Sequence, residues 1–573
     1  MTSRDAIHPL RRRREGGGRE EKLSFLQDFG LYQICLLAAT QISYMPIAAS
    51  ILSTSFMKMG EGSCALVLEA RNSSTSVGAN GTSGTSRYRA GTVPLGEFHS
   101  LLSLWDLDCT QHAVTIQTAI STMIMIGGLA GACISGYVAD RYGRKPVMTA
   151  SLALCSLSNA ALLLSSVLSW PAALPIFLVL GAACGGYMTT NLVLVVESLC
   201  LPSSRLLVVA LNGWSLSMAG TALLAFMCPN WFQYHLSLAI IAAICAVGLF
   251  LIADESLRWL KSSQKAERFD RASSRLIKFN RGENFKDIAL LCQLEKDGTA
   301  APAPLPVARG EEESGQPALS AAPSLSYVDL FAERSLRPRL LALAYCFFSS
   351  SIVSFGFYFA IDSLSGNRYA NLAIAGSGKF ILGLLPFVVS SCVSRKQVAL
   401  ISIAAAATAA WAVLACLLAG LPFQSAAIMV LSLVATAALD PNWKISHLYS
   451  TELFPTSMRN MARGFCNSSA RIGSVLAPLL SHSRHELPHV SIGIFAALLT
   501  AQFAITAAFL PNQVYEPPSS LQDALPSAPA ERQTVEERSS RSRKAKRSEY
   551  EEEDEQRSRE NSSQLSETAP LTP

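Results

Sequence analysis

Residues 136–147 read GYVADRYGRKPV and carry four charged side chains between two long apolar runs. The charges belong to Asp140, Arg141, Arg144 and Lys145, in a chain of which only 16% of the residues are charged. Each flanking run is long enough to cross about 30 Å of hydrocarbon as a helix. The stretch therefore predicts a tight polar turn between two membrane-spanning helices.

The whole chain has the composition of a polytopic membrane protein. Half of its 573 residues are hydrophobic and its mean hydropathy is +0.30, whereas a soluble protein of this length carries more charge. Apolar runs of about 20 residues recur along the sequence, and we predict an all-α membrane protein with twelve transmembrane helices. They lie near residues 28–52, 114–138, 147–168, 172–197, 206–227, 235–253, 338–361, 371–393, 397–419, 423–448, 464–484 and 489–510.

The basic residues of the short loops predict the orientation in the membrane. Loops near 169–171, 228–234 and 420–422 have no Lys or Arg. The loops of the opposite parity do, and by the positive-inside rule they and both termini are cytoplasmic. The basic positions are Arg11–Arg14, Arg141–Lys145, Arg205, Arg258–Lys261, Arg395–Lys396 and Arg459–Arg463.

Two long hydrophilic segments, 53–113 and 255–337, interrupt the predicted helices. The second one separates six helices from six more, which suggests an internal duplication typical of transporters. We expect a cytoplasmic tail, a six-helix bundle with a long outer loop, a cytoplasmic loop, a second six-helix bundle and a disordered cytoplasmic tail. These segments are 1–27, 28–254 with its loop 53–113, 255–337, 338–510 and 511–573.

The outer loop 53–113 has features of an extracellular segment. Asn72 and Asn80 begin Asn-x-Ser/Thr triplets, the acceptor pattern for glycosylation. Cys64 and Cys109 are the only cysteines of the loop, and we expect a disulfide between them.

The two cytoplasmic segments have different expected roles. The loop 255–337 begins with a predicted amphipathic helix. The tail 511–573 contains a mixed charge run that indicates a solvated tail, and the alternative is binding of cytoplasmic partners there. Nucleic-acid binding is not expected from the tail in a membrane protein of this kind. The apolar face of the helix is formed by Leu257, Leu260, Phe269, Leu276 and Ile277.

The charged turn itself suggests a gate. Gly136 and Gly143 permit close packing and a tight turn, while Asp140, Arg141 and Arg144 can form a charge network. Such a network could hold the two halves together when the cavity faces outward. If the basic residues were only topology anchors, the aspartate and both glycines would remain unexplained.

Five blocks of sequence then indicate a family. GYVADRYGRK resembles the signature turn of the major facilitator superfamily. The other four resemble solute carrier family 22, the organic cation and anion transporters, and the resemblance covers roughly residues 25–515. These four blocks are SLWDLDC (103–109), ESLRWL (255–260), TELFPTSMR (451–459) and ARIGSVLAPL (470–479).

Several departures indicate a divergent member, similar to the orphan branch of that family. Phe177 lies near the place of an arginine that many facilitators carry, and Leu257 replaces the usual proline of the ESLRWL block. The second-half counterpart of the charged turn is reduced to residues 394–396, which include no acid.

The resemblance implies a major facilitator fold and a cytoplasmic gate. The gate would contain the charged turn, Glu255 and Arg258 of ESLRWL, and two Glu–Arg pairs that repeat between the halves. The pairs are Glu197 with Arg205 and Glu452 with Arg459.

Charged residues inside predicted spans are candidates for a substrate site. Arg471 shares a helix face with Asn467 and Ser474. The resemblance implies that it matches an arginine of the anion transporters; the alternative is a structural pair with a buried acid. Lys379 lies near a lysine of those transporters, about one turn away.

Other span residues extend the candidate site. Lys444 lies one turn after Asp440, so the two could neutralise each other, or Lys444 could face the substrate. Ser351, Phe355 and Tyr358 share one face of the seventh span, where the family holds flat organic ions between aromatic rings. Asn212, Trp214 and Ser215 of the fifth span are further candidates.

We therefore expect a multi-pass plasma-membrane carrier of amphipathic organic anions that works by alternating access. The sequence has no catalytic constellation, Walker loop or metal-ligand spacing, so we expect neither an enzyme nor a cofactor. One alternative is an organic cation or zwitterion transporter of the same family. Another is a receptor or scaffold built on a transporter fold.

Overall fold

The computed structural model describes residues 29–58, 64, 98–107, 109–110, 112–199, 202–280, 331, 334, 336–389, 393–454, 459–483 and 487–512. All of them belong to one compact unit, Met1–Val514. The predicted glycosylation sites Asn72 and Asn80, most of the outer loop and the tail from residue 513 lie outside the described residues.

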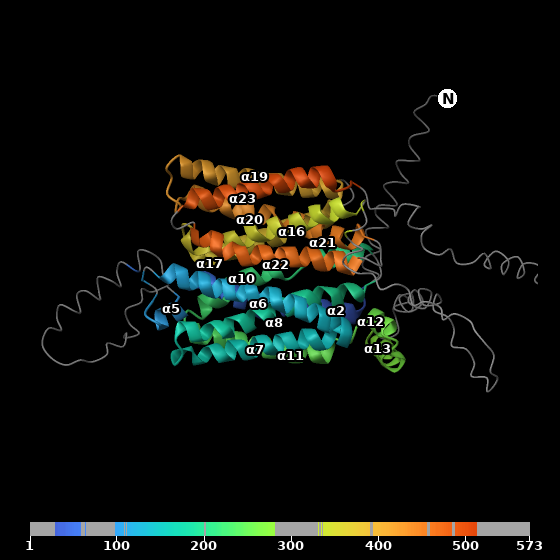
Figure 1. Ribbon diagram of the computed structural model, residues 1–573. Helices are drawn as coiled ribbons and strands as arrows, with labels where there is room; N and C mark the ends of the chain where they lie inside the picture. Colours follow the sequence, from blue (N-terminus) through green and yellow to red (C-terminus); the bar gives the residue numbers. More distant parts are fainter. Residues whose placement is uncertain are drawn as a thin grey trace, which may run out of the picture. The chain divides into compact units, whose positions relative to one another are not determined.

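The described residues fold almost entirely into helices, most of which run side by side in Figure 1. The first half, residues 29–280, contains α2 (Leu31–Ile42), α3 (Tyr44–Leu52), η2 (Ser53–Phe56), α5 (Leu101–Leu104), α6 (Ala113–Tyr142), α7 (Arg144–Leu162), η3 (Leu163–Ser166), α8 (Trp170–Glu197), α9 (Pro202–Ala210), α10 (Trp214–Met227), α11 (Trp231–Ile252), α12 (Leu257–Ser262) and α13 (Ala266–Phe279). The second half, residues 331–512, contains α16 (Arg337–Tyr358), η4 (Ile361–Ser363), α17 (Arg368–Gly383), α18 (Leu385–Val388), α19 (Arg395–Leu418), α20 (Ala426–Ala438), α21 (Asp440–Glu452), α22 (Arg459–Ser483) and α23 (Pro488–Phe509).

Eleven helices or helix pairs among the described residues are long and apolar enough to cross a membrane. Each overlaps one of the ranges predicted from the sequence. The remaining prediction, 464–484, falls on α22, which has 25 residues and is about 37 Å long at 1.5 Å per residue. Arg463, Arg471 and its many small polar residues lower the hydropathy of α22, so it is not among the eleven.

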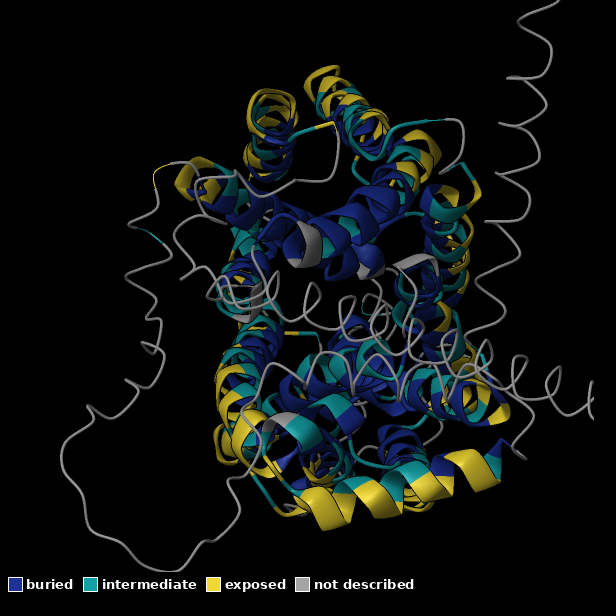
Figure 2. Cartoon of the chain, turned by 90° about the vertical axis from the view of Figure 1, so that its right-hand side faces the viewer, coloured by how far each residue is buried: buried dark blue, intermediate teal, exposed yellow. Residues whose placement is uncertain are grey.

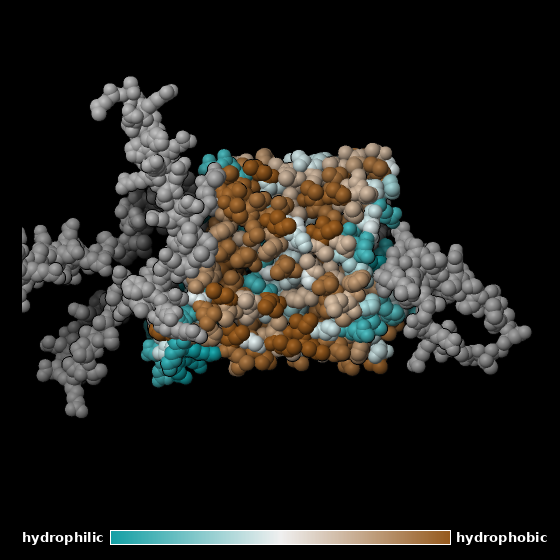
Figure 3. Space-filling view, turned by 180° about the vertical axis from the view of Figure 1, so that it is seen from behind, coloured by the Kyte–Doolittle hydropathy of each residue, from teal (hydrophilic) through white to brown (hydrophobic). Residues whose placement is uncertain are grey.

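The outer surface suits a lipid environment. Large apolar side chains such as Ile244, Val247 and Phe250 of α11 and Ile401 of α19 are exposed on the outside of the bundle. Figure 3 shows apolar residues over the flank and hydrophilic residues gathered toward its two ends. In Figure 2 the buried residues face the middle and the exposed ones face outward.

Helices α6 and α8 cross in unusually close contact. A Cβ on Gly127 or Gly131 of α6 would overlap backbone carbonyls of α8, and one on Gly181 or Gly185 would overlap carbonyls of α6. Small residues four apart on both helices let the backbones meet, as is common in membranes. The two halves join where α6 packs on α22 and α10 packs on α17.

Four of the spans are interrupted. Breaks separate α2 from α3, α9 from α10, α17 from α18 and α20 from α21. In the first half two breaks meet, because the side-chain oxygen of Gln41 accepts a hydrogen bond from the backbone N–H of Gly213. In the second half the breaks at Gly383 and Asp440 also meet, since a Cβ on Gly383 would touch that carboxylate.

The amphipathic helix predicted at the start of segment 255–337 is two helices instead of one. Gln264 has a positive φ of 55° and turns the chain between α12 and α13, because a left-handed residue cannot continue a helix. Leu257, Leu260 and Leu276 are buried as expected, but Ile277 is 37% exposed. The predicted apolar face is therefore only partly buried in α13.

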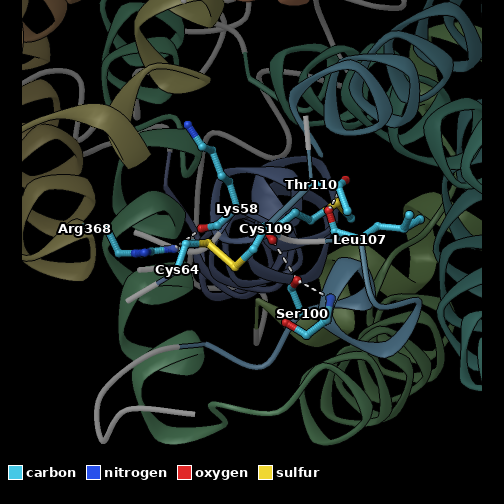
Figure 4. The surroundings of a disulfide bond; sticks show 9 residues. Lys58, Cys64, Ser100, Leu107, Cys109, Thr110 and Arg368 are labelled. Carbon is cyan, nitrogen blue, oxygen red and sulfur yellow. Dashed lines mark hydrogen bonds between the residues drawn. A yellow bond between two sulfur atoms is a disulfide. The ribbon is translucent and has the colours of Figure 1, made fainter. Parts of the chain in front are cut away.

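Opposite α12 and α13 lies an end of the bundle that contains a disulfide, which we call the disulfide end. Cys64 and Cys109 are bonded, with their Cα atoms 5.5 Å apart (Figure 4). Next to this bond Arg368 of the second half donates to the carbonyl of Lys58 in the first half at 2.7 Å. Phe56 and Tyr369 stack there with ring centres 5.5 Å apart, so the two halves are in contact at this end.

Candidate functional site

The charged turn is organised around Gly143 and Glu255, at the end of the bundle opposite the disulfide; we call this the charged end. Gly143 separates α6 from α7 with a φ of 114°. Its missing side chain leaves room for the Glu255 carboxylate, which a Cβ would overlap. Glu255 then accepts the backbone N–H groups of Arg144 at 2.8 Å, Lys145 at 3.2 Å and Ser256 at 3.0 Å. The carboxylate thus occupies the positive N-terminus of α7.

The position of Glu255 has an electrostatic consequence. Partial burial raises the pKa of Glu255 above its ordinary 4.5, and hydrogen bonds from the Ser256, Arg144 and Lys145 backbones oppose this rise. Burial likewise raises the pKa of Asp254, against the opposing effect of Arg275. Arg275 of α13 donates to Asp254 at 2.9 Å, which attaches α13 to the end of α11.

Arg144 is the centre of the charge network. Its side chain is buried and forms ion pairs with Asp140 at 2.9 Å and with Glu197 at 3.4 Å. It also donates to the carbonyl of Ala139 at 3.2 Å. Arg144 therefore connects the ends of α6, α7 and α8, and Glu255 packs against the same turn.

The structure differs from the expectations for the charged turn in three respects. Arg141 points outward, with its guanidinium 5.9 Å from the Tyr142 ring and 3.4 Å from the Tyr137 hydroxyl, and it has no acidic partner among the described residues. The contacts of Arg144 all lie in the first half, so the described network braces one half from within and does not latch the halves together. Gly136 needs no close approach either, since a Cβ there would be 4.0 Å from Thr189.

The structure describes contacts of the side chains of only one of the two predicted Glu–Arg pairs, Glu197 with Arg205. Glu197 reaches Arg144, while Arg205 donates to the carbonyl of Leu199 at 3.0 Å. Arg258 donates to the same carbonyl at 3.2 Å, so two guanidinium groups cover the C-terminus of α8. The side chains of Glu452 and Arg459 lie outside the described residues.

Arg471 of α22 lies at the boundary between the halves. Its Nη2 is 3.7 Å from the Sδ of Met188 in α8, and no acidic side chain pairs with it in the described part of the chain. The neighbouring Gly473 brings α22 close to the backbone of α16 at Phe348. Met188 was not foreseen, because an apolar residue in an apolar span gives no sequence signal.

Two hydroxyl candidates near Arg471 have local contacts. Ser474 donates to the carbonyl of Arg471 at 2.8 Å, so its hydroxyl is used by its own helix. Ser351 lies against Gly473 at the contact of α16 with α22. Asn467 lies one turn before Arg471 on the same helix and is half-buried.

An aromatic cluster joins the two halves beside these residues. Trp214 of α10 lies 6.0 Å from the Phe355 ring and 6.5 Å from the Tyr358 ring of α16. Phe355 and Tyr358 are themselves 5.5 Å apart, edge to face. The two predicted aromatics are thus brought together with Trp214, one of the three candidates in the fifth span.

Three charged residues form a buried cluster in the second half, which we call the charge triad. Lys379 of α17 lies 3.3 Å from one oxygen of Asp440, and Lys444 lies 3.6 Å from the other. Each of the three is 3% exposed. Lys379 also donates to the carbonyl of Thr436 and lies 5.6 Å from the Tyr358 ring, so the triad adjoins the aromatic cluster. The expected Asp440–Lys444 pair is present, but Lys379 shares the carboxylate.

Comparison with known sequences places this arrangement in a family. The family model of the Major Facilitator Superfamily matches residues 36–478. Organic anion transporter 3 of Oryctolagus cuniculus is 25% identical over 438 residues, covering 74% of each chain. Solute carrier family 22 member 6 of Pseudopleuronectes americanus is 26% identical over 81% of this chain and 77% of its own. Member 15 of Xenopus tropicalis is 25% identical over 71% and 72%. These relatives confirm the resemblance to solute carrier family 22.

Solved structures agree on the fold. The proton:xylose symporter XylE bound to 6-bromo-6-deoxy-D-glucose superposes with a TM-score of 0.57 at 13% identity, covering 84% of this chain and 96% of the symporter. A partially occluded inward-open form of the xylose transporter XylE from E. coli gives a TM-score of 0.55, also at 13% identity and 84% coverage of this chain, with all of that chain covered. The protein is a multi-pass membrane transporter, not an enzyme, and it belongs to the Major Facilitator Superfamily.

Proposed function

We propose that the protein carries small amphipathic organic anions across the plasma membrane by alternating access between its two halves. Arg471 is the observation that carries this proposal. It is a permanent cation on a membrane helix that touches the opposite half at Met188, and no described carboxylate neutralises it. An unpaired cation at such a place is costly unless an anion visits it.

In this proposal α22 also crosses the membrane, as the eleventh of twelve transmembrane helices along the chain. The charged end and both termini are cytoplasmic, and the disulfide end with Asn72 and Asn80 is extracellular. This orientation is supported by the distribution of Lys and Arg in the short loops, which are more frequent at the charged end, as the positive-inside rule expects of the cytoplasmic side. The first-half brace around Arg144 and Glu255 would then be the cytoplasmic rim of a half that rotates as a rigid body.

The aromatic cluster would hold the body of the substrate. Trp214 comes from one half and Phe355 and Tyr358 from the other, so a flat apolar group bound among them would contact both halves. Aromatic rings stack on such groups at centroid distances of about 4.5–7 Å. The similarity to organic anion transporter 3 supports an anion as the charged part.

Uptake of labelled benzoate and phenyl sulfate tests the proposal, in cells whose surface level of the protein is measured. We expect saturable uptake that Arg471→Ala abolishes and Arg471→Lys partly restores, because lysine keeps the charge but not the planar fork. Arg268→Ala removes an exposed arginine of α13 and should leave uptake unchanged.

Each failure has a distinct meaning. If uptake is the same in the Arg471 variants as in the wild type, the protein is a carrier but Arg471 is not part of its substrate site. No uptake of anions, cations or zwitterions at normal surface levels would reject transport and favour a receptor or scaffold.

A further inference from the structure

The charge triad has one more positive than negative charge. Lys379 and Lys444 contribute two cations and Asp440 one anion, and all three are buried. Asp440 is the only Asp or Glu in the membrane-spanning ranges of the second half, 337–358, 368–388, 395–418, 426–450, 459–483 and 488–509. The surplus charge therefore has no second carboxylate within those spans, and a buried uncompensated charge is costly.

The triad lies where two interrupted helices meet. Asp440 begins α21 directly after the break from α20, near the middle of the span Ala426–Ser450. Gly383, at the break between α17 and α18, has no Cβ and so leaves room for the Asp440 carboxylate. Broken helices at mid-membrane are typical positions of transport sites, because their ends offer unpaired backbone groups.

The two lysines are not equivalent. Lys444 lies one turn after Asp440 on the same helix, so these two residues stay together when the two halves move relative to each other. Lys379 belongs to α17, which packs on α10 of the first half, and it faces the Tyr358 ring of the aromatic cluster. Lys379 is thus the member that a substrate in that cluster could reach.

We propose that Asp440 is an internal counter-anion that competes with the transported anion for Lys379. This inference rests on the proposed function and makes Asp440 a positioning residue. In the empty carrier Asp440 forms an ion pair with both lysines. When an organic anion arrives, Lys379 turns to it, and Asp440 and Lys444 remain as a neutral pair. The triad thereby accepts one negative charge of the substrate.

Competition predicts opposite effects for two variants that both break the triad. Asp440→Asn removes the competitor and should lower the Kd for benzoate about tenfold, which corresponds to about 1.4 kcal/mol. Lys444→Met leaves Lys379 and Asp440 as a closed neutral pair and should raise the Kd about tenfold. A purely structural triad would weaken binding in both.

The Kd is obtained from the shift in melting temperature of the purified full-length protein with increasing benzoate, so it does not depend on transport. Asp440→Glu keeps the charge and should bind benzoate nearly as the wild type does. Asp254→Asn breaks the Asp254–Arg275 pair outside the membrane spans and should leave the Kd unchanged.

Equal shifts in the same direction, or no benzoate binding by any form, would overturn the inference. If Asp440→Asn does not fold, Asp440→Ser replaces it with the same expected fall in Kd, and an unchanged Kd in Lys444→Met contradicts competition in either case. Opposite shifts without any uptake would retain the inference about Asp440 and reject transport, so the two failures are distinguishable.

Discussion

The Cα of Gly143 and the carboxylate of Glu255 are packed so closely that no side chain fits between them. The contact between these two parts of the chain, more than a hundred residues apart, is thus possible only because Gly143 has no Cβ. The turn needs Gly143 for its φ of 114°, and the start of α7 needs Glu255 to accept its free N–H groups. Arg144 then fixes the same turn to α8 through Glu197.

Gly143→Ala should destabilise the protein by about 1–3 kcal/mol, because only glycine adopts this backbone conformation without strain. Glu255 would also be displaced. Gly136→Ala is the matched control, since its Cβ meets nothing closer than 4.0 Å. Alanine in a helix should even gain about 0.5–1 kcal/mol. Thermal unfolding in detergent measures both, and a Gly143→Ala protein as stable as the wild type would contradict the proposed packing.

Arg144→Gln should reduce both stability and transport, whereas Arg141→Gln should do neither. The first leaves Glu197 without its described ion pair, and removing the partner of a buried charged group costs about 1–3 kcal/mol or more. The second removes an outward-facing guanidinium. Melting temperature and uptake per surface molecule test the difference. Equal loss in both variants would mean that the turn works through its total charge rather than through Arg144.

Glu255 should give stability a pH dependence of definite sign. Its folded pKa is raised above 4.5, so the folded state binds the proton more tightly than the unfolded state does. The stabilisation is complete below pH 4.5 and is lost as pH rises through the folded pKa. In Glu255→Gln the fall of stability with pH just above 4.5 should therefore be shallower than in the wild type. The exposed Glu267→Gln is the control and should keep the wild-type slope.

Much of the fold follows from the sequence, because spans are set by the length and hydropathy of single segments. Every predicted range falls on a helix or helix pair, and the positions of Gly143, Glu255 and Arg471 were foreseen as special. Interruptions such as that at Asp440 were not foreseen, because the hydropathy averaged over a whole span does not show where its helix breaks.

The partners of charged residues were harder to predict than the residues themselves. Arg144 forms an ion pair with Glu197 that was not predicted, and Lys379 joins Asp440 from another helix. Such pairings depend on how helices rotate and tilt against each other, which a single sequence does not specify. Arg141 illustrates the point, because its neighbours in sequence form the network and it points away.

The disulfide between Cys64 and Cys109 should stabilise the disulfide end of the bundle. It closes a loop with a sequence separation of 45, and a bridge of this kind contributes about 2–4 kcal/mol. Reductant should therefore lower the melting temperature of the wild type but not that of a Cys64→Ala/Cys109→Ala variant, which should already melt lower. Cys245→Ala removes a free cysteine of α11 and should keep the response to reductant. A wild-type protein that is insensitive to reductant, with both thiols open to alkylation, would show that the bond does not form.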